Sequence, residues 1–128
     1  MPLKKPRPTA GELEILNVLW ESGPLSVRDT QRLLDATKPT GYTTVLKLLQ
    51  IMTDKGLVER DETKRPQIYR PSIPREHTQR QLLRDLAERA FGGSVKDLVL
   101  QALADRQSSR AELEEMERLL DRMEGRKK

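Results

Sequence analysis

Five polar side chains near the middle of the chain have chemistry suited to nucleic acid: Tyr42, Thr43, Thr44, Lys47 and Gln50. A threonine hydroxyl or a glutamine amide can hydrogen-bond the edge of a base, and a threonine methyl can pack on the methyl of thymine. A lysine ammonium can reach a guanine edge or a phosphate, and a preceding tyrosine can contact the backbone. We therefore expect these residues to contact a DNA duplex.

Residues 40–56 are predicted to form the helix that presents these side chains. Its apolar residues recur at helical spacing and would face a core: Val45, Leu48, Leu49 and Met52. The first turn holds no carboxylate, although acidic residues usually stabilise a helix N-terminus. A carboxylate at this position would repel the phosphates of DNA. These features suit a helix whose first residues enter a DNA groove, but an ordinary amphipathic helix with a polar start would also have them.

Two further helices and a turn are predicted before this helix. A capping box at residues 9–12 begins the first, and residues 22–24 (Ser-Gly-Pro) end it. Ser26 caps a second helix, whose outer face carries Arg28 as a candidate phosphate contact. Its inner face consists of Val27, Thr30, Leu33 and Leu34. The turn at 36–41 then completes a helix-turn-helix pattern.

A β-hairpin is predicted directly after the third helix. Residues 57–60 and 67–70 form its strands, and a polar turn joins them, with Lys64 and Arg65 at the tip. A lone hairpin is marginally stable in water, so this one should pack on the helices. A hairpin after a helix-turn-helix is the winged-helix arrangement, in which the tip could reach a phosphate or the minor groove.

The remaining sequence predicts three helices with one-sided apolar stripes. The residues of these stripes are Leu82, Leu86, Leu98, Val99, Leu103, Leu113, Met116, Leu120 and Met123. The last four step by the three and four residues typical of a coiled-coil seam. Such short helices make a poor core alone, so we expect a second copy to complete it. The alternative is that they fold back on the N-terminal half.

The predicted domain organisation follows from these patterns. We expect a flexible basic tail at 1–8, a winged-helix DNA-binding domain at 9–72, a helical dimerisation domain at 73–124 and a flexible tail at 125–128. The net charge of +4 is compatible with a polyanionic partner but decides nothing alone.

Catalytic and metal chemistry are poorly represented in the sequence. The 128 residues include no cysteine and one histidine, His77, which excludes thiolate metal sites and cysteine nucleophiles. The acidic residues fall on solvated helix faces, and no phosphate-binding loop is present. We therefore expect no enzyme, no metal and no cofactor. No apolar run is long enough for a membrane span, so a cytoplasmic location without membrane insertion is expected.

Three stretches resemble the penicillinase-repressor family of bacterial transcription regulators, also called the BlaI/MecI/CopY type: TAGELEILNVLW, GYTTVLKLLQIMTDKGLVERD and QIYRP. The likeness runs from about residue 8 to residue 103 and weakens in the last helix. The resemblance implies a winged-helix domain, a helical dimerisation domain and repression from a dyad-symmetric operator, in a resistance or stress-response operon. An antibiotic-sensing membrane protease system, or a metal, lifts repression in such relatives.

The resemblance also assigns roles to individual positions. Thr43 and Thr44 match the start of the family's recognition helix, and Lys47 and Gln50 lie further along the face that enters the major groove. Residues 64–65 lie at the position of the family's wing.

Two departures from the family pattern concern the signal that relieves repression. The metal-responsive branch has a cysteine cluster that this chain lacks, which argues against copper sensing. The proteolysed branch is cut in a segment resembling VLNFL, and the matching segment here is VLQAL at 99–103. Gln101 and Ala102 replace the Asn-Phe pair there, so they mark a candidate proteolytic switch, with a sensor protease as the upstream partner.

The sequence therefore predicts a mainly α-helical fold with a small β-hairpin: a winged helix-turn-helix domain followed by a three-helix dimerisation domain. The predicted function is that of a homodimeric repressor that binds a double-stranded DNA operator. The alternative is a winged-helix protein-interaction module without sequence-specific DNA binding. Salt separates the two, because binding through phosphates weakens steeply as salt rises.

Overall fold

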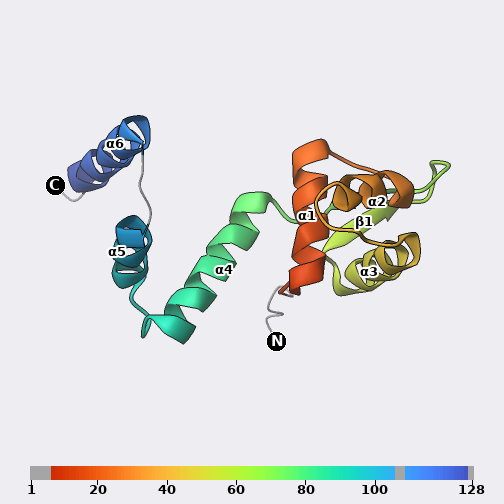
Figure 1. Cartoon of the computed structure of the whole chain (residues 1–128), viewed down its shortest axis with the longest axis horizontal. Helices are drawn as coiled ribbons and strands as arrows, with labels where there is room; N and C mark the ends of the chain where they lie inside the picture. The colour runs from red at the N-terminus through yellow and green to blue at the C-terminus, as the bar shows by residue number, and fades with distance from the viewer. Residues whose placement is uncertain (1–6, 106–108, 127–128) are drawn as a thin grey trace. The chain divides into compact units, whose positions relative to one another are not determined.

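The computed structural model describes residues 7–105 and 109–126 (Figure 1). Over these residues the chain forms helices and one two-stranded antiparallel sheet, which confirms the predicted fold class. The elements are α1 (Ala10–Ser22), α2 (Val27–Asp35), α3 (Tyr42–Lys55), β1 (Val58–Asp61), β2 (Ile68–Pro71), α4 (Arg75–Ala90), α5 (Val95–Asp105) and α6 (Arg110–Arg126). Contacts divide the chain into two compact units, Met1–Leu82 and Leu83–Lys128.

This division falls within α4, whereas the sequence analysis drew the domain boundary between residues 72 and 73. The first turns of α4 belong to the N-terminal unit, where Thr78 is buried at 2% exposure. At the C-terminal end, α6 continues to Arg126, into the segment predicted as a tail. The rest of that tail, and most of the predicted N-terminal tail, lies outside the described residues.

Local capping determines where the first helices begin. Thr9 and Glu12 form the predicted capping box: the Thr9 hydroxyl accepts from the Glu12 N–H over 3.3 Å, and the Glu12 carboxylate accepts from the Thr9 N–H over 2.9 Å. The Ser26 hydroxyl accepts from the Asp29 N–H over 3.1 Å and caps α2 in the same way. Helix α3 ends at Gly56, whose φ of 80° is a left-handed conformation that favours glycine.

Side chains of α1, α3 and the hairpin form the core of the N-terminal unit. The most buried apolar residues are Ile15, Leu16, Leu19, Val45, Leu49, Met52, Leu57, Val58 and Tyr69. Helix α2 adds Val27, Leu34 and the buried Thr30, whose hydroxyl donates to the Ser26 carbonyl over 2.8 Å. The prediction that Leu33 faces inward is wrong: it is 43% exposed. One residue turns a helix by about 100°, and Leu34 occupies the inward position.

The hairpin begins one residue later in each strand than the sequence predicted. Val58 pairs with Pro71 and Asp61 pairs with Ile68. Leu57 precedes the first strand: its N–H closes the end of α3 by donating to the Met52 carbonyl over 2.8 Å, and its carbonyl accepts from the Ser72 N–H over 2.9 Å. An isolated β-bridge between Leu25 and Tyr69 also ties the second strand to the connection between α1 and α2.

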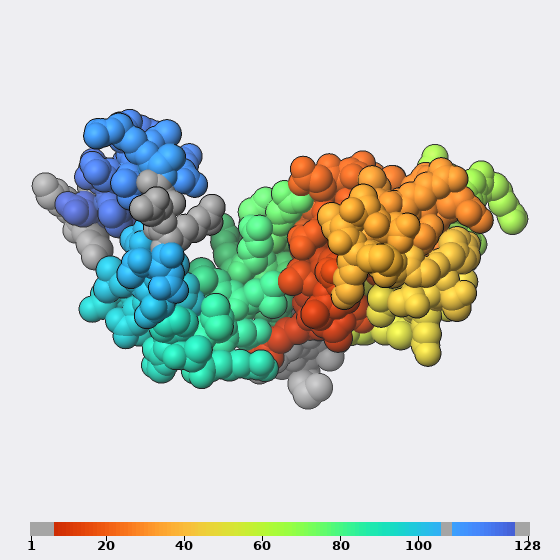
Figure 2. Space-filling view, viewed as in Figure 1, coloured from red at the N-terminus to blue at the C-terminus, as the bar shows by residue number. Residues whose placement is uncertain are grey.

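Helices α2 and α3 lie next to each other on one surface of the N-terminal unit, and the turn of the hairpin projects beyond them (Figure 2). Helices α2 and α3 and the turn of the hairpin carry the positions that the sequence analysis assigned to DNA binding. The helix-turn-helix and the wing are therefore parts of one compact unit whose core holds them in place.

The C-terminal unit leaves its apolar side chains largely exposed. Helix α5 has no buried residue. Of the predicted dimerisation residues, Leu98 in this unit and Leu82 in the N-terminal unit are half-buried. The others are 37–57% exposed: Leu86, Val99, Leu103, Leu113, Met116, Leu120 and Met123. Exposed apolar side chains at this density are typical of a surface that a partner covers.

Candidate nucleic-acid interface

The first turn of α3 is exposed and its backbone N–H groups receive no side-chain cap. Gly41 occupies the N-cap position, and no acidic residue lies in the first turn. Thr43 and Thr44 are both exposed, and Tyr42 is 44% exposed. Free N–H groups and the positive end of the helix dipole favour a negatively charged ligand here.

Further along α3, Lys47 and Gln50 continue the exposed face that begins at Thr43. Positions 43, 47 and 50 are spaced by four and three residues, so they lie in one row along the helix. The row lies opposite the buried side chains of Val45 and Leu49. The structure thus brings the predicted base-contacting residues onto one solvent-facing surface.

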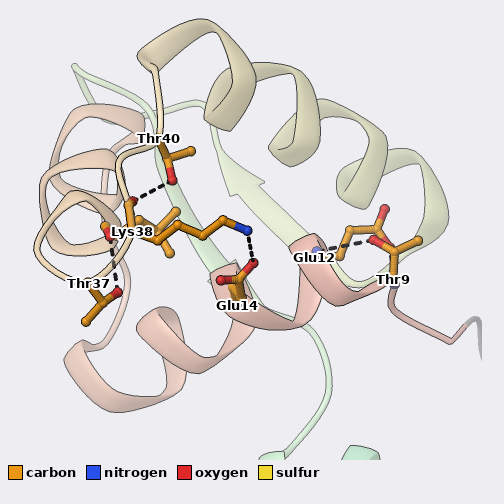
Figure 3. A network of polar contacts seen from close by, with 7 residues as sticks. Thr9, Glu12, Glu14, Thr37, Lys38 and Thr40 are labelled. Atoms are coloured by element: carbon orange, nitrogen blue, oxygen red, sulfur yellow. Dashed lines mark hydrogen bonds and ion pairs between the residues drawn. The ribbon is translucent and has the colours of Figure 1, made fainter.

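The turn before α3 is held by polar contacts that the sequence analysis did not identify. The Gln31 amide donates to the Thr40 carbonyl over 3.0 Å, and the Asp35 carboxylate accepts from the Thr40 N–H over 3.1 Å. On the other side of the turn, the Lys38 ammonium lies 3.7 Å from the carboxylate of Glu14 in α1 (Figure 3). These contacts fix the point at which α3 begins. Asp35 is five residues from Thr40, a local signal that sequence inspection could have found.

Arg28 and Tyr42 lie together, although they belong to different helices. The guanidinium carbon of Arg28 lies 5.4 Å from the centre of the Tyr42 ring, within the range of a cation–π contact. Both residues line a hollow of about 360 Å³ between α2, α3 and the hairpin, to which the hairpin contributes Gln67. The sequence analysis named Arg28 and Tyr42 separately, and it missed Gln67.

The wing turn is ordered by Asp61. Its carboxylate accepts from the N–H of Thr63 over 3.0 Å and from the hydroxyl of Thr63 over 2.6 Å. These hydrogen bonds hold the pKa of the Asp61 carboxyl below its usual range. Lys64 and Arg65 follow in the turn, and both are exposed. The turn therefore presents two cations on a hydrogen-bonded backbone.

Ion pairs distinguish two groups of basic residues in the N-terminal unit. Several have a carboxylate partner within 4.0 Å: Arg32, Lys38, Lys55, Arg60, Arg70 and Arg75. Within the described residues, no such partner is found for Arg28, Lys47, Lys64 and Arg65, which are the cations that the sequence analysis assigned to DNA. These four side chains are exposed on α2, α3 and the wing turn.

A buried ion pair holds the far end of α3. The Lys55 ammonium lies 2.6 Å from the Glu12 carboxylate, which is only 2% exposed and also accepts from the Thr9 N–H. Burial raises the pKa of Glu12, but the hydrogen bonds from Lys55 and Thr9 lower it further, so the pKa lies below its ordinary value. This pair joins the first turn of α1 to the last turn of α3.

The candidate switch residues Gln101 and Ala102 lie within α5 and are exposed. No group of histidine, cysteine or acidic side chains suited to a metal is found among the described residues. A search of the same residues finds no helix with the length and apolar character of a membrane span.

The family model described as "Penicillinase repressor" matches residues 8–122. The chain belongs to the penicillinase repressor family. The penicillinase repressor of Bacillus licheniformis is 24% identical over 125 residues, which is 98% of each chain. Membership of a family of transcriptional repressors confirms the predicted family and identifies the chain as a repressor and not an enzyme.

Two solved structures are similar to this repressor. The solution structure of monomeric B. licheniformis BlaI in complex with the blaP half-operator has a TM-score of 0.50 at 23% identity, covering 57% of this chain and 89% of that one. The structure of reduced AbfR bound to DNA has a TM-score of 0.42 at 19% identity, covering 90% and 72% of the two chains. The first likeness supports the winged-helix fold.

Proposed function

We propose that this repressor binds a dyad-symmetric DNA operator as a homodimer, with one α3 helix in the major groove of each half-site. The observation that supports the proposal most directly is the surface of the N-terminal unit. An uncapped helix start, a polar row at Thr43, Lys47 and Gln50, and cations without carboxylate partners all lie on it. Base edges and phosphates have the complementary chemistry.

Each part of this surface has an expected role. Thr43 and Gln50 hydrogen-bond base edges, and Lys47 contacts a guanine edge or a phosphate. Tyr42 and Arg28, which lie against each other, contact the phosphate backbone beside α3. The wing, through Lys64 and Arg65, contacts a neighbouring phosphate or the minor groove. The BlaI complex with its half-operator is a precedent for DNA binding by this fold.

Dimerisation is supported by the exposed apolar side chains of α5 and α6. A second copy would bury Leu113, Met116 and Leu120 against their equivalents or against α5, and so remove them from water. Two symmetric subunits would then meet half-sites about one helical turn apart, or at a multiple of this distance. Occupancy of the operator would occlude a promoter, in the cytoplasm where the chromosome lies.

A sensor protease is the proposed upstream partner, with its cut near Gln101 and Ala102. Proteases require an extended backbone, so α5 must open locally before cleavage. The absence of any buried side chain in the described helix α5 is consistent with a low cost of opening. Incubation with the cognate sensor protease, followed by mass spectrometry, tests this: an intact 99–103 segment would exclude this site.

The test of DNA binding is selection of duplexes from a random library by the full-length chain, followed by footprinting on the selected DNA. We expect a dyad-symmetric footprint and affinity that falls steeply with salt, by a slope of about 0.9 per phosphate contact. The alternative, a protein-interaction module, predicts no selected sequence and little dependence on salt. That result would contradict the proposal.

A further inference from the structure

Helix α3 begins without a side-chain cap, unlike the two helices that precede it. Thr9 caps α1 and Ser26 caps α2, each by accepting a hydrogen bond from the N–H of the third residue after it. Gly41 occupies the same position at α3 and has no side chain that could accept one. Because a capping side chain helps to fix where a helix starts, the start of α3 depends on contacts from elsewhere.

Two side chains of α2 bind both backbone polar groups of Thr40, the residue before this N-cap. The Gln31 amide donates to the Thr40 carbonyl over 3.0 Å, and the Asp35 carboxylate accepts from the Thr40 N–H over 3.1 Å. Residues 31 and 35 are four apart, so their side chains leave the same face of α2. We call Gln31, Asp35 and Thr40 the α2 clamp.

The turn that leads to the clamp is itself hydrogen-bonded. The Thr40 hydroxyl donates to the Lys38 carbonyl over 2.9 Å (Figure 3). The Lys38 N–H donates to the carbonyl of Leu34, in the last turn of α2, over 2.9 Å. Pro39 lies between these residues, and its ring restricts φ. The turn therefore has little freedom of its own, and the clamp restrains its last residue directly.

The clamp immediately precedes the side chains that we expect to contact DNA. Thr40 is followed by Gly41, Tyr42 and Thr43. A functional side chain must be held within about 0.5 Å of its productive position to form a specific contact. Attraction between basic side chains and phosphates does not depend on base sequence and supplies most of non-specific binding. A displaced first turn of α3 should therefore impair recognition of bases more than attachment to phosphates.

We infer that Gln31 and Asp35 are positioning residues for sequence discrimination by this repressor. They act through Thr40 and need no contact with DNA. This inference rests on the proposed function, because discrimination has a meaning only if α3 contacts base edges. All the contacts that support it lie within the N-terminal unit, so it is independent of how two subunits pair.

The experiment replaces Asp35 in two ways that separate its hydrogen bond from its charge. Asp35→Asn loses the negative charge but keeps an oxygen that can accept from the Thr40 N–H, whereas Asp35→Ala loses both. Asp29→Ala is the matched control, because Asp29 is an exposed carboxylate of the same helix, 3.8 Å from Arg32. Competition binding at several salt concentrations measures the affinity of each full-length variant for selected duplexes and for random DNA.

We expect Asp35→Ala to lower the ratio of affinities for selected and random DNA about three- to tenfold, the effect of one hydrogen bond. Asp35→Asn should retain most of this ratio and Asp29→Ala all of it. Loss of a negative charge changes both affinities together, so it cancels in the ratio.

Gln31→Ala provides a second test without a change of charge. It should lower the same ratio by a similar factor, because it removes the donor to the Thr40 carbonyl. The slope of log affinity against log salt should stay the same, since no phosphate contact is lost. A merely structural role would instead lower the folded fraction, and binding to selected and random DNA would fall by the same factor.

An unchanged ratio in both Asp35→Ala and Gln31→Ala would overturn the inference and leave the proposed function intact. A ratio that falls as far in Asp35→Asn as in Asp35→Ala would also overturn it, because charge and not the hydrogen bond would then be responsible. If the unaltered chain does not discriminate between DNA sequences, the proposed function itself fails. Circular dichroism checks the fold of each variant, and Gln31→Ala decides alone should Asp35→Ala not fold.

Discussion

Thr43 and Thr44 differ in where they lie on α3, although both are exposed. Thr43 belongs to the row that continues through Lys47 and Gln50, at the centre of the exposed face. Thr44 lies at the edge of that face, where it lines a hollow of about 280 Å³ together with Leu48 of α3 and Gly11 of α1. A helix in the major groove presents its central row to base edges and its margins to the backbone. The two threonines should therefore contribute differently.

We predict that Thr43→Ala reduces discrimination between selected and random DNA more than Thr44→Ala does. A lost base contact costs about 1–3 kcal/mol, equivalent to about a five- to 150-fold change in the specificity ratio. Competition binding measures the ratio, and Thr37→Ala is the control, because its hydroxyl already donates to the carbonyl of Leu34. Equal ratios for Thr43→Ala and the unaltered chain would refute its role at a base edge.

Glu12 contributes to the stability of the fold, because its buried carboxylate is stabilised in the charged form. We predict that Glu12→Gln lowers the free energy of unfolding at neutral pH by about 1.5–3 kcal/mol, the contribution of a hydrogen bond to a charged group. Since the folded pKa lies below the ordinary 4.5, this contribution is present above that value and is lost as pH falls through the folded pKa. Urea unfolding at neutral pH and below pH 4 measures the difference. A difference that stays constant with pH would show that the carboxylate charge is not responsible.

At the scale of elements, the proposed role of the wing is to contact DNA phosphates, which are the same whatever the base sequence. Lys64 and Arg65 follow a turn ordered by Asp61, so their positions are restricted although their side chains are exposed. We predict that Lys64→Ala with Arg65→Ala weakens binding to selected and random DNA alike. The slope of log affinity against log salt should fall by about 1 for each lost phosphate contact. Titrations at several salt concentrations test this.

The control for the wing is Arg70→Ala, because Arg70 is paired with Glu59 across the hairpin at 3.1 Å. Its loss should leave the salt slope nearly unchanged. If the double wing variant keeps the slope of the unaltered chain, the wing tip makes no phosphate contact.

Interactions between neighbouring residues were predictable from the sequence, whereas contacts between elements were not. The Thr9–Glu12 capping box spans three residues, so its pattern is visible in the letters. The contact of Arg28 with Tyr42 and the pair of Glu12 with Lys55 depend on how helices pack. A single sequence indicates the outward face of most helices, with Leu33 of α2 as an exception, but does not give the partner of each side chain.

The segment before α4, residues 72–74, illustrates the same limit. Pro71, Ser72 and Pro74 are typical of a break between domains, and the sequence analysis placed the boundary there. The hydrogen bond from Trp20 to Ile73, between residues far apart in sequence, instead ties this segment to the N-terminal unit. Composition indicates where regular structure stops, but packing decides whether the stop is a hinge.

For the whole molecule, α6 offers the most direct test of assembly. Its apolar stripe includes Leu120, which is 57% exposed and has no cover in the single chain. We predict that Leu120→Asp weakens the proposed dimer about ten- to 150-fold, because burial of a leucine contributes about 1.5–3 kcal/mol. Sedimentation over a range of concentrations measures the dissociation constant.

Arg118→Asp is the matched control, because it introduces the same side chain on the charged face of α6, beside Glu115 and Asp121. It should leave the dimer intact. Operator affinity should fall with dimer affinity in Leu120→Asp, because a single subunit holds one half-site, while affinity for that half-site alone should stay the same. A Leu120→Asp chain that still sediments as a dimer would place the contact between subunits elsewhere, and α5 with its exposed Val99 and Leu103 would be the next surface to test.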